Sequence, residues 1–145
     1  AIGPTHVEIS GHPLRPGNQY QVLLSQAGSV SFRRLELFLE LEEQATFRQG
    51  TDVRTERQVV WQSLIRRWNN VEPLSGTPFE AEVQLQLPSK AMHSFSSTHN
   101  TVSWRLVLRG VPEHWPALVR VFPVVVFPAE IISIDGKKAI VQTRT

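Results

Sequence analysis

The hydrophobic residues of this chain recur at every second position over long stretches, which is typical of β-strands with one buried face. The clearest stretch carries Leu35, Leu37, Leu39 and Leu41, separated by Glu36, Phe38, Glu40 and Glu42. Leucine and glutamate favour helices, but a helix would scatter these leucines around its circumference. The alternation therefore predicts a strand with its leucines in the core.

Two further stretches show the same period: residues 79–87 with Phe79, Ala81, Val83, Leu85 and Leu87, and residues 102–109 with Val102, Trp104, Leu106 and Leu108. Shorter candidate strands are residues 5–10, 19–24, 54–67, 118–127, 131–134 and 139–142. The pattern predicts about nine strands in all.

Turn-forming residues separate these strands. Pro16-Gly17, Gly28-Ser29, Gly50 and Gly76 lie between them, and Asp135-Gly136 is typical of a type I′ hairpin turn. Short strands divided by such turns predict an all-β, two-sheet sandwich, and 145 residues suffice for one core. We assign residues 1–128 to the sandwich and 129–145 to a C-terminal hairpin extension or the start of a following segment.

Two prolines, Pro123 and Pro128, flank residues 124–127. Proline cannot donate a backbone hydrogen bond within a sheet, so this strand is expected to be bent or to lie at a sheet edge. An edge strand can pair with a strand of another chain.

The formal net charge is only +2, from 15 basic and 13 acidic residues, and the basic residues occur as isolated pairs. This distribution does not predict nucleic-acid binding. The chain has no cysteine, which fits a reducing compartment, and no apolar run of about 20 residues. We expect a cytoplasmic protein, or the soluble part of a larger membrane-associated protein. Because the chain begins with Ala1, we expect a domain of a longer protein.

Candidate catalytic groups are few. His93 and His99 share a loop with Ser94, which would suit a hydrolase or a metal site, but the histidine spacing is not that of metal ligands. The two aspartates, Asp52 and Asp135, lie in turns. We therefore predict no catalytic residue, no metal and no cofactor, and keep His93 and His99 as candidate binding residues.

The four tryptophans divide into two groups. Trp61 and Trp104 are in phase with neighbouring apolar residues, so we expect them in the core. Trp68 and Trp115 lie beside turn residues, where an exposed indole can anchor a partner or stack on a sugar ring. These two are the principal candidate binding residues.

A series of short motifs resembles the arrestin-type β-sandwich. The motifs are Leu14-Arg15-Pro16-Gly17, Leu87-Pro88, Ser94-Phe95 and Val102-Ser103-Trp104-Arg105-Leu106, and the resemblance covers residues 7–128. It implies an immunoglobulin-like sandwich and a scaffold or adaptor role without catalysis, as in arrestins and bacterial sporulation-control proteins. The sequence reveals neither a buried polar core nor a basic phosphate-reading cluster, so phosphoprotein recognition is not inferred.

These observations predict a non-enzymatic domain that binds a protein partner through strand edges or loops. A carbohydrate-binding sandwich and a structural domain of a larger membrane-associated protein are the alternatives. The sequence does not determine the oligomeric state.

Overall fold

The computed structural model describes residues 2–74, 76–128, 131–132 and 138–139. Within these ranges the chain contains strands and no helix, so no described helix could cross a membrane. The strands are β1 (Ile2–Ile9), β2 (Gln19–Gly28), β3 (Phe32–Gln49), β4 (Asp52–Val71), β5 (Phe79–Gln86), β6 (Phe95–Ser96), β7 (Asn100–Pro112), β8 (Leu118–Val124), β9 (Ile131–Ile132) and β10 (Lys138–Ala139).

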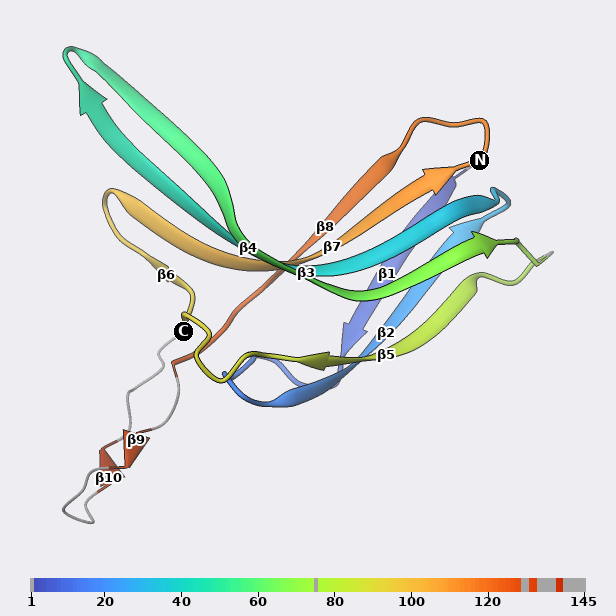
Figure 1. Ribbon diagram of the computed structural model, residues 1–145, viewed down its shortest axis with the longest axis horizontal. Helices are drawn as coiled ribbons and strands as arrows, with labels where there is room; N and C mark the ends of the chain where they lie inside the picture. The colour runs from blue at the N-terminus through green and yellow to red at the C-terminus, as the bar shows by residue number, and fades with distance from the viewer. Residues whose placement is uncertain (1, 75, 129–130, 133–137, 140–145) are drawn as a thin grey trace.

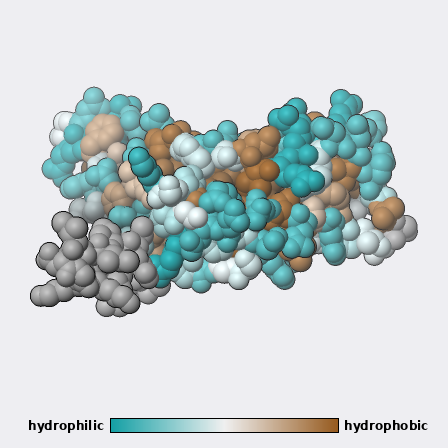
Figure 2. Space-filling model, turned by 60° about the horizontal axis from the view of Figure 1, so that its bottom comes forward, coloured by the Kyte–Doolittle hydropathy of each residue, from teal (hydrophilic) through white to brown (hydrophobic). Residues whose placement is uncertain are grey.

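Two antiparallel sheets form the sandwich (Figure 1). The large sheet has the order β4-β3-β7-β6, with β8 also paired to β7, and the small sheet has the order β1-β2-β5. The predicted all-β sandwich is therefore confirmed. On the face shown in Figure 2, hydrophilic side chains cover most of the coloured area, and hydrophobic side chains reach the surface near its middle.

The core lies between the sheets and consists mainly of the leucines and valines that the alternation predicted to be inside. Leu35, Leu37 and Leu39 of β3 are buried, and they face Leu24, Val83 and Leu85 of the small sheet. Trp104 is buried as predicted, whereas Trp61 is half-buried and packs against the core margin.

The β3–β4 hairpin is longer than the sequence predicted. Its turn is centred on Gly50, whose φ of 65° suits glycine. β3 pairs with β7 only as far as Ala45, so the last residues before the turn pair with β4 alone. They form a two-stranded ribbon that projects beyond the sandwich at the upper left of Figure 1.

The chain changes its pairing partner between Pro123 and Pro128. β8 ends at Val124, and the chain then forms a parallel bridge between Val126 and Leu14. The Leu14 amide donates to the Val125 carbonyl and the Phe127 amide to the Leu14 carbonyl, each at 2.8 Å.

The C-terminal hairpin was predicted around Asp135-Gly136, and these two residues lie outside the described residues. On either side of them, β9 and β10 pair antiparallel, with Lys138 opposite Ile132 and Ala139 opposite Ile131.

Candidate functional site

Three loops meet at one end of the sandwich, on the right of Figure 1: residues 28–31, 72–78 and 113–117, of which residue 75 is not described. We call this surface the loop end. Phe32 pairs with both Val71 and Pro112, which places the end of β4, the start of β3 and the end of β7 side by side. The strand register therefore brings together loops that are far apart in the sequence.

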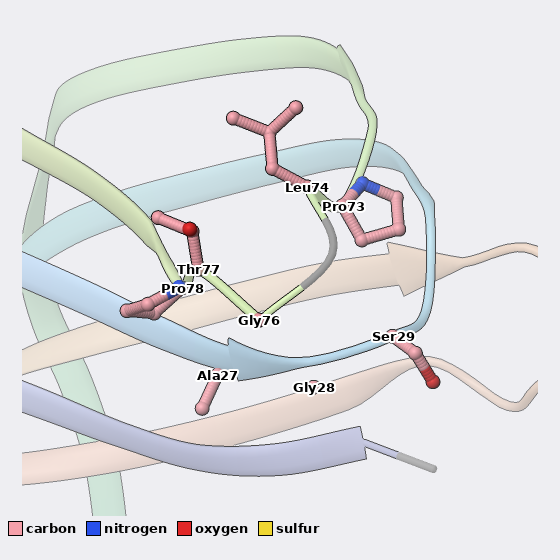
Figure 3. A pocket seen from close by; sticks show the side chains of 8 residues that line it. All are labelled: Ala27, Gly28, Ser29, Pro73, Leu74, Gly76, Thr77 and Pro78. Carbon is pink, nitrogen blue, oxygen red and sulfur yellow. The ribbon is translucent and has the colours of Figure 1, made fainter.

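A shallow pocket of about 630 Å³ lies between two of these loops (Figure 3). It is lined by Ala27, Gly28, Ser29, Pro73, Leu74, Gly76, Thr77 and Pro78. Small side chains and prolines leave the backbone accessible, and Leu74 is 71% exposed. The Thr77 amide donates to the Leu74 carbonyl at 3.1 Å, which holds the loop in a tight turn.

Trp115 borders a second pocket at this end, of about 310 Å³, together with Ser29, Val30, Ser31, Glu113 and His114. Its side chain is 54% exposed. The Glu113 amide donates to the Ser31 carbonyl at 2.9 Å and so ties the two loops together. Because Ser29 lines both pockets, the two pockets lie next to each other.

Trp68 occupies a different environment. It pairs with Leu35 on the inner face of β4, is half-buried, and packs edge-on against Phe79 with ring centroids 5.6 Å apart. The Arg66 guanidinium lies 6.0 Å from its ring centre. Trp68 thus supports the start of β5, while Trp115 presents its ring to solvent.

The two candidate histidines lie at the opposite end. His93 is exposed, with its ring centre 6.1 Å from that of Phe95, and the His99 carbonyl accepts the Thr46 amide at 2.7 Å. The Ser94 hydroxyl accepts the Val126 amide at 3.1 Å, so it fastens the chain after β8. Among the described residues, no group of three or more His, Cys, Asp or Glu could hold a metal.

A charged cluster on the outer face of the large sheet was not predicted from the sequence. Glu40 is fully buried; it accepts hydrogen bonds from Gln62 at 2.6 Å, from Arg105 at 3.2 Å and from Arg109 at 3.3 Å. Arg105 also pairs with Glu42 at 3.0 Å. Four residues before Glu40 on β3, Glu36 pairs with Arg34 and Arg67 at 3.3 and 2.6 Å.

Burial alone would raise the pKa of Glu40, but the hydrogen bonds from Gln62, Arg109 and Arg105 outweigh it and hold the pKa below its usual value. Glu40 is therefore ionised and fully engaged, which suits a structural carboxylate and not a proton acceptor.

An apolar row lies between the row of Glu40 and the row of Glu36 on this face, and Arg109 reaches across it to Glu40. Leu64, Phe38, Val107 and Val121 lie side by side on β4, β3, β7 and β8. The row containing Glu40 and Arg105 borders it on one side, and the row containing Glu36 and Arg109 borders it on the other.

No family model matches the chain, and no curated protein is significantly similar to it in sequence. Solved structures do resemble it. The sporulation control protein Spo0M from Bacillus subtilis matches with a TM-score of 0.59 and 10% sequence identity, over 84% of this chain and 48% of that protein. The chain thus spans about half the length of Spo0M.

A β-glucosidase from Listeria innocua, solved in complex with gluconolactone, matches with a TM-score of 0.30 and 16% identity, over 85% of this chain and 16% of that one. That similarity is too low to carry an argument. At 10% identity the likeness to Spo0M shows the fold alone. The predicted resemblance is therefore confirmed as a related β-sandwich fold.

Proposed function

We propose that this chain is a non-enzymatic, arrestin-like interaction domain that binds a protein partner through its loops or strand edges. The observation that carries the proposal is the loop end, where the exposed side chains of Leu74 and Trp115 lie on two adjacent pockets. Exposed apolar groups on loops held by a rigid sandwich are typical of recognition surfaces.

Two potentially reactive side chains, Glu40 and Ser94, are occupied by structural hydrogen bonds, which supports a non-catalytic role. Glu40 is ionised beneath two arginines, and Ser94 accepts a backbone hydrogen bond that secures the chain after β8. Both groups contribute to the fold. The cytoplasmic location and the domain bounds 1–128 and 129–145 stay predictions.

The test is partner capture by the purified chain, followed by measurement of affinity with the identified protein. The double variant Leu74→Ser with Trp115→Ala should lose most of the binding, because it removes both exposed apolar groups of the loop end. Val53→Ser is the matched control, since Val53 is 64% exposed on the projecting ribbon. Equal affinity of the double variant and the control, or turnover of a substrate, would contradict the proposal.

A carbohydrate-binding role is the second candidate, and the surroundings of Trp115 favour it. Ser29, Ser31 and Glu113 place hydroxyl and carboxylate groups in the pocket beside the exposed indole. Sugars are recognised by such a combination of a flat ring and polar groups. Titration with soluble oligosaccharides should then quench Trp115 fluorescence, and Trp115→Phe should retain binding that Trp115→Ala loses. Unchanged binding in Trp115→Ala would exclude this site.

A further inference from the structure

The edge strands of the two sheets differ in how well they are protected against pairing with another strand. β1 contains Pro4 and an irregular register between Ile2 and Thr5. Its side of the sandwich is closed by Arg120 of β8, which donates to the Gly3 carbonyl at 2.9 Å and to the Thr5 hydroxyl at 3.2 Å. β8 itself carries Pro123. Proline and irregular register both discourage strand addition.

β4 forms the other edge of the large sheet and is interrupted twice. Its register with β3 shifts between Leu37 and Phe38 and again between Leu41 and Glu42. Such bulges twist an edge and make it a poor template for a straight strand.

β5 lacks these protections. It pairs with β2 over all eight of its residues without a register shift, it contains no proline, and its other edge has no partner among the described residues. Alternate N–H and C=O groups of such an edge point away from the sheet and are free to pair.

Between β4 and β5 lies a seam that leads from this edge toward the core of the sandwich. A cavity of about 160 Å³ opens there, with Leu39 and Leu85 of the core among its lining residues, beside Ser63, Ile65 and Gln84. Trp61 and Trp68 lie along the same inner side of β4 and remain half-buried. A side chain entering from the β5 edge would therefore meet apolar groups.

The outer face of β5 carries charge at alternate positions. Glu80 and Glu82 are exposed, and neither forms an ion pair within the described part of the chain. A strand added beside β5 would place every second side chain next to these carboxylates. Opposite charges at such cross-strand positions stabilise the pairing.

We propose that the free edge of β5 receives an extended segment of a partner protein in which apolar residues alternate with lysine or arginine. The apolar residues face the β4–β5 seam, and the basic residues lie beside Glu80 and Glu82. This assignment rests on the proposed interaction function and names the surface and the chemistry of the partner.

The charge of β5 selects a basic segment over a second copy of the chain. A second copy pairing antiparallel through its own β5 would add its exposed Glu80 and Glu82 to the same outer face. Like charges on neighbouring strands destabilise such a pairing, whereas lysine or arginine at these positions stabilises it.

The experiment is a titration of the isotopically labelled full chain with a peptide of about nine residues that alternates valine and lysine. NMR shift changes should be confined to β5 and to the facing part of β4, and the β5 amides should exchange more slowly with solvent. A peptide with glutamate in place of lysine should bind about tenfold more weakly.

Charge reversal supplies the controls. The Glu82→Lys variant should bind the lysine peptide about tenfold more weakly than the wild type does, and it should bind the glutamate peptide more tightly. The control is Glu8→Lys. Glu8 lies on β1 in the same cross-strand row as Glu82, with Leu23 of β2 between them. Reversing its charge should leave the affinities for both peptides unchanged.

Three results would overturn the inference: shift changes at the loop end instead of β5, equal affinity of both peptides, or full exchange protection of β5 in the free chain. A partner captured through the loop end, with no peptide bound at β5, would also overturn it and would leave the proposed function standing.

Discussion

Glu40 illustrates how a residue on the solvent side of a strand can become fully buried. It alternates with the core leucines of β3 and so faces outward, but Arg105 and Arg109 from β7 and Gln62 from β4 cover it. Long arginine side chains bury their aliphatic parts while their guanidinium groups satisfy the carboxylate.

Replacing Glu40 by glutamine should lower the free energy of unfolding by about 1–3 kcal/mol, because Arg105 and Arg109 lose their shared carboxylate. Urea denaturation at neutral pH measures the change. Glu80→Gln is the matched control on an exposed glutamate and should change stability by less than about 0.5 kcal/mol. Similar values for the two variants would show that the cluster does not stabilise the fold.

The pH dependence of stability should carry the signature of Glu40. Because its folded pKa lies below the usual value of 4.5, the folded state binds fewer protons, and the stabilisation is complete above that value. It is lost as the pH falls through the folded pKa. The stability difference between wild type and Glu40→Gln should therefore shrink on acidification. A difference independent of pH would contradict the depressed pKa.

The sequence alone could not reveal this cluster. Alternation correctly placed Glu40 on the other face of β3 from the leucines, but its arginine partners lie 65 and 69 residues away along the chain. The register between β3 and β7 decides which residues meet, and no local pattern encodes it. Neighbouring turn residues were an incomplete guide for the tryptophans, since they made Trp68 and Trp115 equal candidates, yet Trp115 is exposed and Trp68 is half-buried against Phe79.

At the scale of elements, the ribbon at the end of β3 and β4 contributes little to the core. Residues 47–54 are exposed, and beyond Thr46 and Thr55, whose hydroxyls lie 3.2 Å apart, the strands contact only each other. An isolated two-stranded hairpin is only marginally stable.

Replacing residues 47–54 by a two-residue Asn-Gly turn should therefore change the free energy of unfolding by less than about 1 kcal/mol. Thermal and urea denaturation of the shortened chain measure this. Loss of cooperative unfolding would show that the ribbon stabilises the sandwich.

Strand positions followed from alternation wherever one face is buried, as in β5 and β7. Prediction was incomplete for β4. The strand begins at Asp52, two residues before the predicted start, on the ribbon where neither face is buried, and it extends past residue 67 to the buried Val71. β6 was not predicted at all, because its two residues, Phe95 and Ser96, are both exposed and are held only by pairing with β7.

At the scale of the whole molecule, Arg120 joins the two sheets along one side through its hydrogen bonds to Gly3 and Thr5. Arg120→Ala should lower the free energy of unfolding by about 1–2 kcal/mol and should speed hydrogen exchange in β1 more than in β5. Arg33→Ala, on an exposed arginine of β3, is the control. If hydrogen exchange were accelerated equally in both sheets, the result would contradict a local stabilising role of Arg120 at β1.

The sandwich architecture was predictable because the alternation of apolar and polar residues within a strand shows which of its faces is buried. The order of strands and the protection of each edge were not, since both depend on contacts between distant segments. The exposed edge of β5 and the closed side at Arg120 emerge only when the two sheets are assembled.

The rows on the outer face of the large sheet also specify the register of β3 against β7. If β3 slipped by two residues along β7, every leucine would still point inward, so the core would tolerate the error. In one such slipped alignment, Glu40 would lie opposite Val107 and Phe38 opposite Arg109, in place of their native partners Arg105 and Val107. The carboxylate would lose Arg105 as its directly opposite residue, and the Phe38 ring would take the place of Glu36 opposite Arg109. The charged and apolar rows thus favour the native register of β3 and β7 over this slipped alignment.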